Sequence, residues 1–110
     1  MEQFPDKKES MTVRQQLIEK LRDPRGLYDL DTKKSVDVWL ESEVLDEGLS
    51  NKAEHDFFIE TKRAALFFDA GFAGEAIKFL KAAKLQAAKD GVWEFAKKTS
   101  ENLQEAIDAM

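Results

Sequence analysis

The chain has 110 residues, of which 43% are hydrophobic and 35% charged, with a formal net charge of −5. This composition is typical of one folded domain and excludes a disordered chain. The absence of cysteine excludes disulfides and thiolate metal sites. Because no apolar run is long enough to span a bilayer and no apolar secretory signal is present, we expect a cytoplasmic protein with no membrane partner. The acidic balance also argues against a nucleic-acid partner, since phosphates repel such a surface.

The amino-terminal segment is polar and is interrupted by Pro5. We therefore expect a flexible tail over residues 1–10. The remainder, residues 11–110, shows no sustained alternation of apolar and polar residues, so we expect no sheet. The sequence predicts a single all-α domain of about five helices, arranged as antiparallel hairpins or as a small helical bundle.

The first helix has a signal at each end. Thr12 and Gln15 fit a capping box, in which each side chain satisfies a free backbone N–H of the first turn. Asp23 ends the helix, because a residue that precedes proline is pushed out of the helical backbone conformation. Apolar residues recur at every fourth position on one face: Val13, Leu17 and Leu21. A connection over residues 23–34 follows, and we expect Leu27, Tyr28 and Leu30 to hold it against the core.

A second helix is predicted over residues 35–47, with Ser35 as its N-cap and Gly48 as its stop. Its main apolar stripe comprises Val36, Leu40 and Val44. Val38 and Leu45 fall on another side of the helix. This second apolar stripe could pack against a second copy of the chain and give a homodimer.

The third helix is predicted to start near Ser50 or Asn51, where Asn51 with Glu54 offers a box-like cap, and to run to about residue 70, where Gly71 ends it. Its apolar arc covers well over half the circumference and includes Phe57, Thr61, Ala64 and Phe68. A helix with so wide an apolar arc must be covered from two directions, so we place it at the centre of the domain. The remaining polar strip comprises Asp56, Glu60 and Arg63.

The fourth helix is predicted over residues 73–90, after a turn formed by residues 72–74, and Gly91 stops it. Its inward face is built mainly from small residues: Ala76, Leu80, Ala83 and Ala87. Small residues allow two helices to approach closely, so we expect the third and fourth helices to form a tight hairpin. The fifth helix is predicted as one continuous amphipathic helix over residues 92–109.

Several positions of this hairpin match a known repeat pattern. Ala64 stands at a small position of the first helix, Phe67 at an aromatic position and Gly71 in the turn, followed by small or aliphatic residues at Ala76, Leu80 and Ala83. In this respect the segment over residues 57–90 resembles a tetratricopeptide repeat. Trp93 falls within one residue of the place where the next repeat would have its tryptophan.

Three positions depart from the pattern of that family. Glu60 and Arg63 stand where it has Trp and Leu, and Ala88 stands where it has Pro. Residues 11–49 contain no second copy of the repeat. The resemblance implies a non-catalytic module that binds a peptide or protein in a groove lined by the first helix. Here that lining would be Asp56, Glu60 and Arg63, and the two carboxylates would suit a basic partner.

Charge is distributed unevenly along the chain. Residues 41–60 carry seven acidic side chains against one lysine, whereas residues 78–98 carry six lysines against two acidic side chains. We expect the acidic region to select a basic protein or peptide, because complementary charge speeds encounter and rejects wrong partners. Tryptophan is enriched among binding hot spots, so the predicted partner-binding set comprises Trp39, Glu43, Asp56, Glu60, Arg63 and Trp93.

Two alternative functions remain open at this point. A small acidic inhibitor or immunity-type protein would use the acidic region to block a basic active site. A histidine phosphotransfer domain is also a small helical bundle, but that family has Lys and Gly three and four residues after its histidine. After His55, those places hold Phe58 and Ile59. One histidine without cysteine cannot form a zinc site, so we expect no metal, no cofactor and no catalytic residue.

Overall fold

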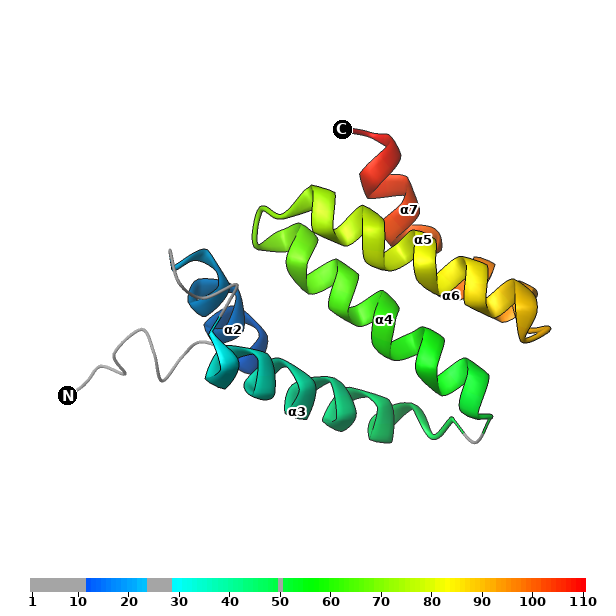
Figure 1. The fold of residues 1–110 in the computed structure, drawn as a ribbon, viewed down its shortest axis with the longest axis horizontal. Helices are drawn as coiled ribbons and strands as arrows, with labels where there is room; N and C mark the ends of the chain where they lie inside the picture. Colours follow the sequence, from blue (N-terminus) through cyan, green and yellow to red (C-terminus); the bar gives the residue numbers. More distant parts are fainter. Residues whose placement is uncertain (1–11, 24–28, 50) are drawn as a thin grey trace.

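The computed structural model describes residues 12–23, 29–49 and 51–110, so the tail predicted over residues 1–10 lies outside the described residues. The described part of the chain consists of helices without any strand, which confirms the all-α prediction. None of these helices is both long and apolar enough to cross a membrane. The described residues form six helices (Figure 1): α2 (Val13–Arg22), α3 (Leu30–Glu47), α4 (Lys52–Asp69), α5 (Ala73–Lys89), α6 (Trp93–Thr99) and α7 (Glu101–Asp108).

Helices α4 and α5 form an antiparallel hairpin and lie side by side along most of their length (Figure 1). Small side chains make this close approach feasible, because Ala64 and Ala76 are 0% exposed and Ala83 is 7% exposed. The buried face of α5 consists of the four residues predicted for it: Ala76, Leu80, Ala83 and Ala87. The hairpin inferred from the spacing of small residues is therefore confirmed.

The turn between these two helices depends on Gly71. Its φ of 97° lies in the left-handed region, where a side chain would be strained. The Phe72 N–H donates to the Phe67 carbonyl at 2.8 Å, and the Gly71 N–H donates to the Phe68 carbonyl at 3.1 Å. This Schellman arrangement satisfies the last carbonyls of α4. Helix α5 begins directly afterwards at Ala73, so residues 73 and 74 belong to the helix and not to the predicted turn.

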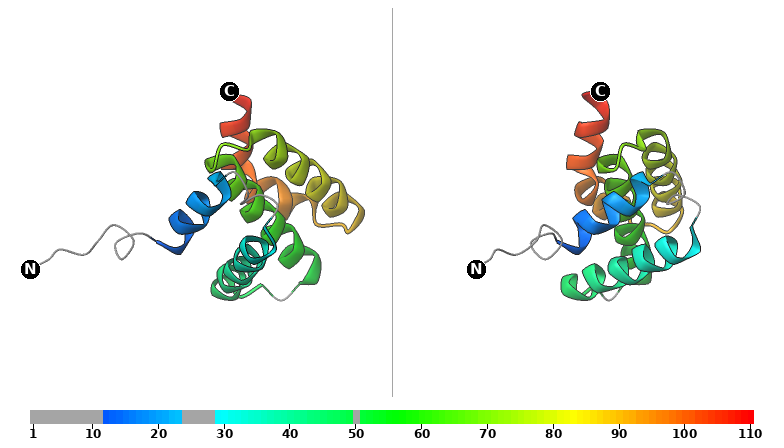
Figure 2. Two further views of the ribbon diagram at one scale, coloured as in Figure 1. Left: turned by 60° about the vertical axis from the view of Figure 1, so that its left-hand side comes forward. Right: turned by 90° about the vertical axis from the view of Figure 1, so that its left-hand side faces the viewer.

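Helix α4 lies at the centre of the domain, as predicted from its wide apolar arc. It contacts α2, α3, α5 and α6. Its buried residues point in several directions and comprise Phe57, Phe58, Thr61, Ala64, Leu66 and Phe67. Two elements therefore cover α4 from each side: α5 and α6 on one, α2 and α3 on the other (Figures 1 and 2).

Helix α3 begins five residues before the position predicted for it. Asp29, and not Ser35, is the N-cap, since its carboxylate accepts from the Thr32 N–H at 3.3 Å and from the Thr32 hydroxyl at 3.0 Å. Because Asp29 caps the helix six residues before Ser35, the helix already includes Ser35 as an interior residue. Leu30 is 70% exposed and does not hold the connection against the core, contrary to the prediction, while Leu27 and Tyr28 lie outside the described residues. The stripe of Val36, Leu40 and Val44 is buried as expected.

Helix α2 packs against both α3 and α4. The predicted capping box is present, because the Gln15 N–H donates to the Thr12 hydroxyl at 3.1 Å and the Thr12 N–H donates to the Gln15 side chain at 3.3 Å. An ion pair between Arg14 and Asp69 ties α2 to the last residue of α4. Leu17 and Leu21 enter the core, so α2 closes the open end of the α3–α4 pair.

The predicted helix over residues 92–109 is wrong as one continuous element, because it is divided into α6 and α7 at Ser100. The Ser100 side chain is buried, and its hydroxyl donates to the Ala96 carbonyl at 2.7 Å. A serine hydroxyl that bonds back to the preceding turn bends a helix in this way. Helix α6 packs on α4 and α5, with the Phe57 and Phe95 rings edge to face at 6.3 Å, and α7 then turns away from α6 (Figure 2).

Candidate interaction surface

A strip of charged side chains follows the seam between α3 and α4. We call it the charged strip and define it by Asp37 and Glu41 of α3 and Asp56, Glu60 and Arg63 of α4. At one end, a guanidinium nitrogen of Arg63 lies 2.9 Å from the Asp37 carboxylate, and another lies 3.5 Å from Glu60. Exposed ion pairs such as these contribute only about 0–1 kcal/mol to stability. The strip therefore adds little to folding, and its excess negative charge faces solvent.

At the other end of the strip, His55 lies between two carboxylates. Its ring nitrogens are 3.7 Å from Glu41 of α3 and 3.3 Å from Asp56. Lys52 donates to Asp56 at 2.8 Å, and this hydrogen bond holds the pKa of the Asp56 carboxyl below its ordinary value. The same contact raises the pKa of Lys52. Asp56 thus stays ionised down to a lower pH than a free aspartate would.

The structure brings together only part of the predicted partner-binding set. Asp56, Glu60 and Arg63 lie together on α4, as predicted, although Arg63 is engaged by Asp37 and Glu60. Glu43 lies on α3 about 200° around the helix from Glu41, so it belongs to the opposite flank. The remaining two residues, Trp39 and Trp93, lie on other parts of the molecule.

The two tryptophans differ in their exposure. Trp39 is half-buried and packs against the core, so most of its ring supports the fold. Trp93 is 44% exposed at the start of α6. Because α4 and α5 are antiparallel, the start of α6 lies at the same end of the molecule as the start of α4, where Lys52 and Asp56 are found. Trp93 is therefore the better placed of the two to contact a partner at that end.

The α3 half of the charged strip was not in the predicted partner-binding set, although Glu41 falls within the acidic region over residues 41–60. Asp37 and Glu41 are four residues apart and so share one side of α3. That spacing was visible in the sequence, but which side of α3 faces α4 depends on the packing of the two helices.

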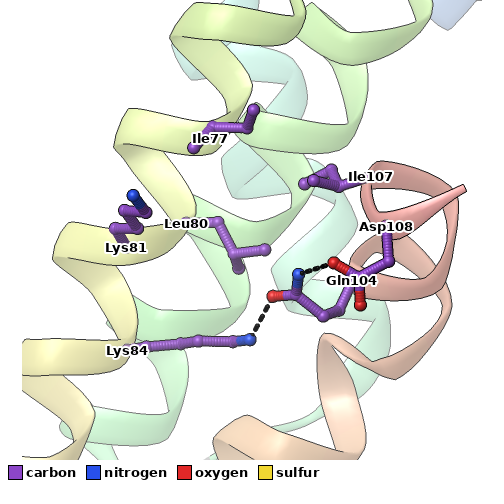
Figure 3. Close-up of a pocket in the computed structure, with 7 residues that line it drawn as sticks. All are labelled: Ile77, Leu80, Lys81, Lys84, Gln104, Ile107 and Asp108. Atoms are coloured by element: carbon purple, nitrogen blue, oxygen red, sulfur yellow. Dashed lines mark hydrogen bonds between the residues drawn. The ribbon is translucent and has the colours of Figure 1, made fainter. Parts of the chain in front are cut away.

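A small pocket between α5 and α7 was also missed (Figure 3). Its volume is about 280 Å³, and it is lined by Ile77, Leu80, Lys81, Lys84, Gln104, Ile107 and Asp108. Lys84 donates to Gln104, and the Gln104 amide donates to Asp108 at 2.9 Å. These contacts tie α7 to α5 at one side of the pocket. We call this site the α5–α7 pocket.

Among residues 12–23, 29–49 and 51–110, no three His, Cys, Asp or Glu side chains are grouped as a metal site would require. The carboxylates of the charged strip are solvated, and those of Asp56 and Glu60 are 53% and 37% exposed. The chemistry available to the strip is electrostatic recognition of a positively charged surface. Comparison with known proteins found no matching family, no matching curated protein and no matching solved structure.

Proposed function

We propose that the chain is a non-catalytic interaction module that binds a basic protein or peptide through the charged strip. The observation that carries this proposal is the excess of carboxylates at the α3–α4 seam. Four of them, Asp37, Glu41, Asp56 and Glu60, are opposed by Arg63 and Lys52. Two packed helices hold these carboxylates in place, so a partner need not order them on binding. The proposed location is the cytoplasm, in line with a chain that lacks cysteine.

The helical hairpin supports the same proposal. Tetratricopeptide-like hairpins present the surface of a first helix to a peptide, and α4 would be that helix here. The residues in place of the family's Trp and Leu, Glu60 and Arg63, both lie in the charged strip. At these two positions a charged residue stands where the family has a packing residue. Such a surface is better suited to binding a charged partner than to packing against a further repeat.

An acidic inhibitor or immunity-type protein is the second candidate. The observation that favours it is the charge of α3, which carries six acidic residues against two lysines. Such a surface would cover a basic active site. Phosphotransfer at His55 is less well supported, because Glu41 and Asp56 lie within 3.7 Å of its ring and would repel a phosphoryl group.

The test is affinity capture from cell extract with the wild-type chain and with Asp56→Lys/Glu60→Lys, followed by mass spectrometry. We expect the variant to lose the captured protein while its circular dichroism spectrum stays helical. The matched control, Glu19→Lys/Glu105→Lys, makes the same change in net charge at exposed sites of α2 and α7. It should capture as the wild type does.

Equal capture by all three proteins would refute the proposal, because the charged strip would then contribute nothing. The identity of the captured protein separates the two candidates. A nuclease or toxin whose activity falls on binding favours the inhibitor, and a chaperone or complex subunit favours the interaction module.

A further inference from the structure

The α5–α7 pocket differs from the charged strip in both shape and charge. Leu80 is 2% exposed and forms its floor, and the half-buried Ile77 and Ile107 form apolar walls. Lys81 and Lys84 stand on the α5 side (Figure 3). The single carboxylate, Asp108, already accepts a hydrogen bond from Gln104. The pocket would therefore suit an occupant that presents an apolar group next to a carboxylate.

The size of the pocket limits its occupant. Pockets for drug-sized ligands and cofactors usually measure roughly 300–1,000 Å³, and this one, at about 280 Å³, lies below that range. A pocket of this size suits one or two aliphatic side chains. The size of the pocket therefore favours a side chain of a protein over a free small molecule.

Helix α3 carries side chains of this kind on its outer face, which we define by Val38, Glu41 and Leu45. Val38 is 71% exposed and Leu45 is 80% exposed, and nothing in the described structure covers them. They are seven residues apart, which is the spacing of anchors on a helix that packs into a groove. Glu41 lies between them along the helix, within about 60° of each.

The charges of the two helices are complementary. Helix α3 contains six acidic residues against two lysines, whereas α5 contains four lysines against one glutamate. Helix α4 separates α3 from α5 within one molecule (Figures 1 and 2), so the outer face of α3 cannot reach the pocket of its own chain. A second copy of the chain can supply it.

We propose that the α5–α7 pocket receives the outer face of α3 from a second copy of this chain. Val38 and Leu45 pack against Ile77, Leu80 and Ile107, and Glu41 pairs with Lys81. The contact joins two different surfaces and is therefore heterologous, so copies either close into a ring or continue as a chain. The proposal goes beyond the proposed function, because Glu41, at the edge of α3 between the two surfaces, is the one member of the charged strip that it uses, and it requires neither Asp56 nor Glu60.

The test measures mass in solution by light scattering across a wide range of protein concentration. The wild-type mass should rise above the 12.6 kDa of one chain as concentration increases. Leu45→Glu removes the α3 anchor and Lys81→Glu reverses the charge of the pocket. Both residues are exposed, so the variants should keep the wild-type circular dichroism spectrum and remain at the mass of one chain.

Mixing the two variants gives the decisive result. Leu45→Glu still has an intact pocket and Lys81→Glu still has an intact α3, so an equimolar mixture should form a pair of one chain of each and no larger species. The matched controls, Leu85→Glu and Lys78→Glu, make the same changes on α5 at residues that do not line the pocket. They should associate as the wild type does.

Three outcomes would overturn the proposal. They are a wild-type chain that stays at 12.6 kDa at every concentration, variants that associate as the wild type does, and a mixture that remains monomeric. The variant Asp56→Lys/Glu60→Lys separates the two proposals. If it no longer captures a partner, the proposed function is supported. If it still self-associates as the wild type does, self-association is shown to be independent of these two residues. The failure of one can therefore be told from the failure of the other.

Discussion

Lys52 and Asp56 show how single residues set the charge of the charged strip. They are four residues apart in the first turns of α4, and the lysine donates to the carboxylate at 2.8 Å. The lysine is far more exposed than its partner, at 87% against 53%. Solvent therefore screens the pair, and its main consequence is the ionisation of Asp56 and not the stability of the fold.

This contact predicts a measurable titration. The hydrogen bond from Lys52 lowers the pKa of Asp56 in the folded chain below the ordinary value of 3.8. Its stabilising effect is therefore present above the unfolded pKa and is lost as pH falls through the folded pKa. NMR titration of the Asp56 carboxyl should show a pKa below 3.8 in the wild type and a return toward that value in Lys52→Ala. Identical titration curves would show that the two side chains do not interact in solution.

At the scale of the element, the α4–α5 hairpin depends on side chains that are small enough for two helices to touch. Ala64 and Ala76 are wholly buried, and Ala83 continues the same face of α5. A larger residue on that face must displace a neighbour or push α5 away from the core, since protein interiors contain few voids.

Ala83→Leu tests this packing. We expect it to lower the free energy of unfolding by about 1–3 kcal/mol, the usual cost of overpacking a core. Chemical denaturation followed by circular dichroism would measure it. The neighbouring Ala82 is exposed, so Ala82→Leu provides the same change outside the core and should shift stability by no more than about 0.5 kcal/mol. If both variants unfold at the same denaturant concentration, the buried face of α5 has been placed wrongly.

The elements were predictable from the sequence to different degrees. The four buried residues of α5 and the cap of α2 follow from local spacing, and both are confirmed. The predicted start of α3 was wrong because Asp29 and Ser35 are both residue types that cap helices well. The local sequence pattern does not show which of the two begins the helix. The break at Ser100 was missed because a serine is tolerated in a helix, and only its burial and its bond to Ala96 reveal the bend.

At the scale of the whole molecule, the candidate sites arise where elements meet. Asp56, Glu60 and Arg63 were predicted because they follow one another on one helix. Asp37 was not predicted, and Glu41 was predicted only as part of the acidic region over residues 41–60, since their place opposite α4 depends on how two helices pack. The α5–α7 pocket was beyond prediction for the same reason, because it exists only where the bend at Ser100 leaves residues of α7 facing α5.

The arrangement of charge also depends on how the helices pack. The acidic α3 and the lysine-rich α5 lie on either side of the central α4 (Figures 1 and 2). The chain therefore presents a negative surface and a positive surface in different directions. Under the proposed function, the chain would bind its partner through charge that is fixed by its helices, with little rearrangement of the core.

The most direct test of this account is carboxyl footprinting of the chain alone and in complex with the protein that it captures. Exposed carboxylates are labelled in both states, and mass spectrometry measures the labelling at each residue. The account predicts that labelling of Asp37, Glu41, Asp56 and Glu60 falls in the complex while that of Glu19 and Glu105 is unchanged. Equal labelling of the four strip carboxylates in both states would contradict it.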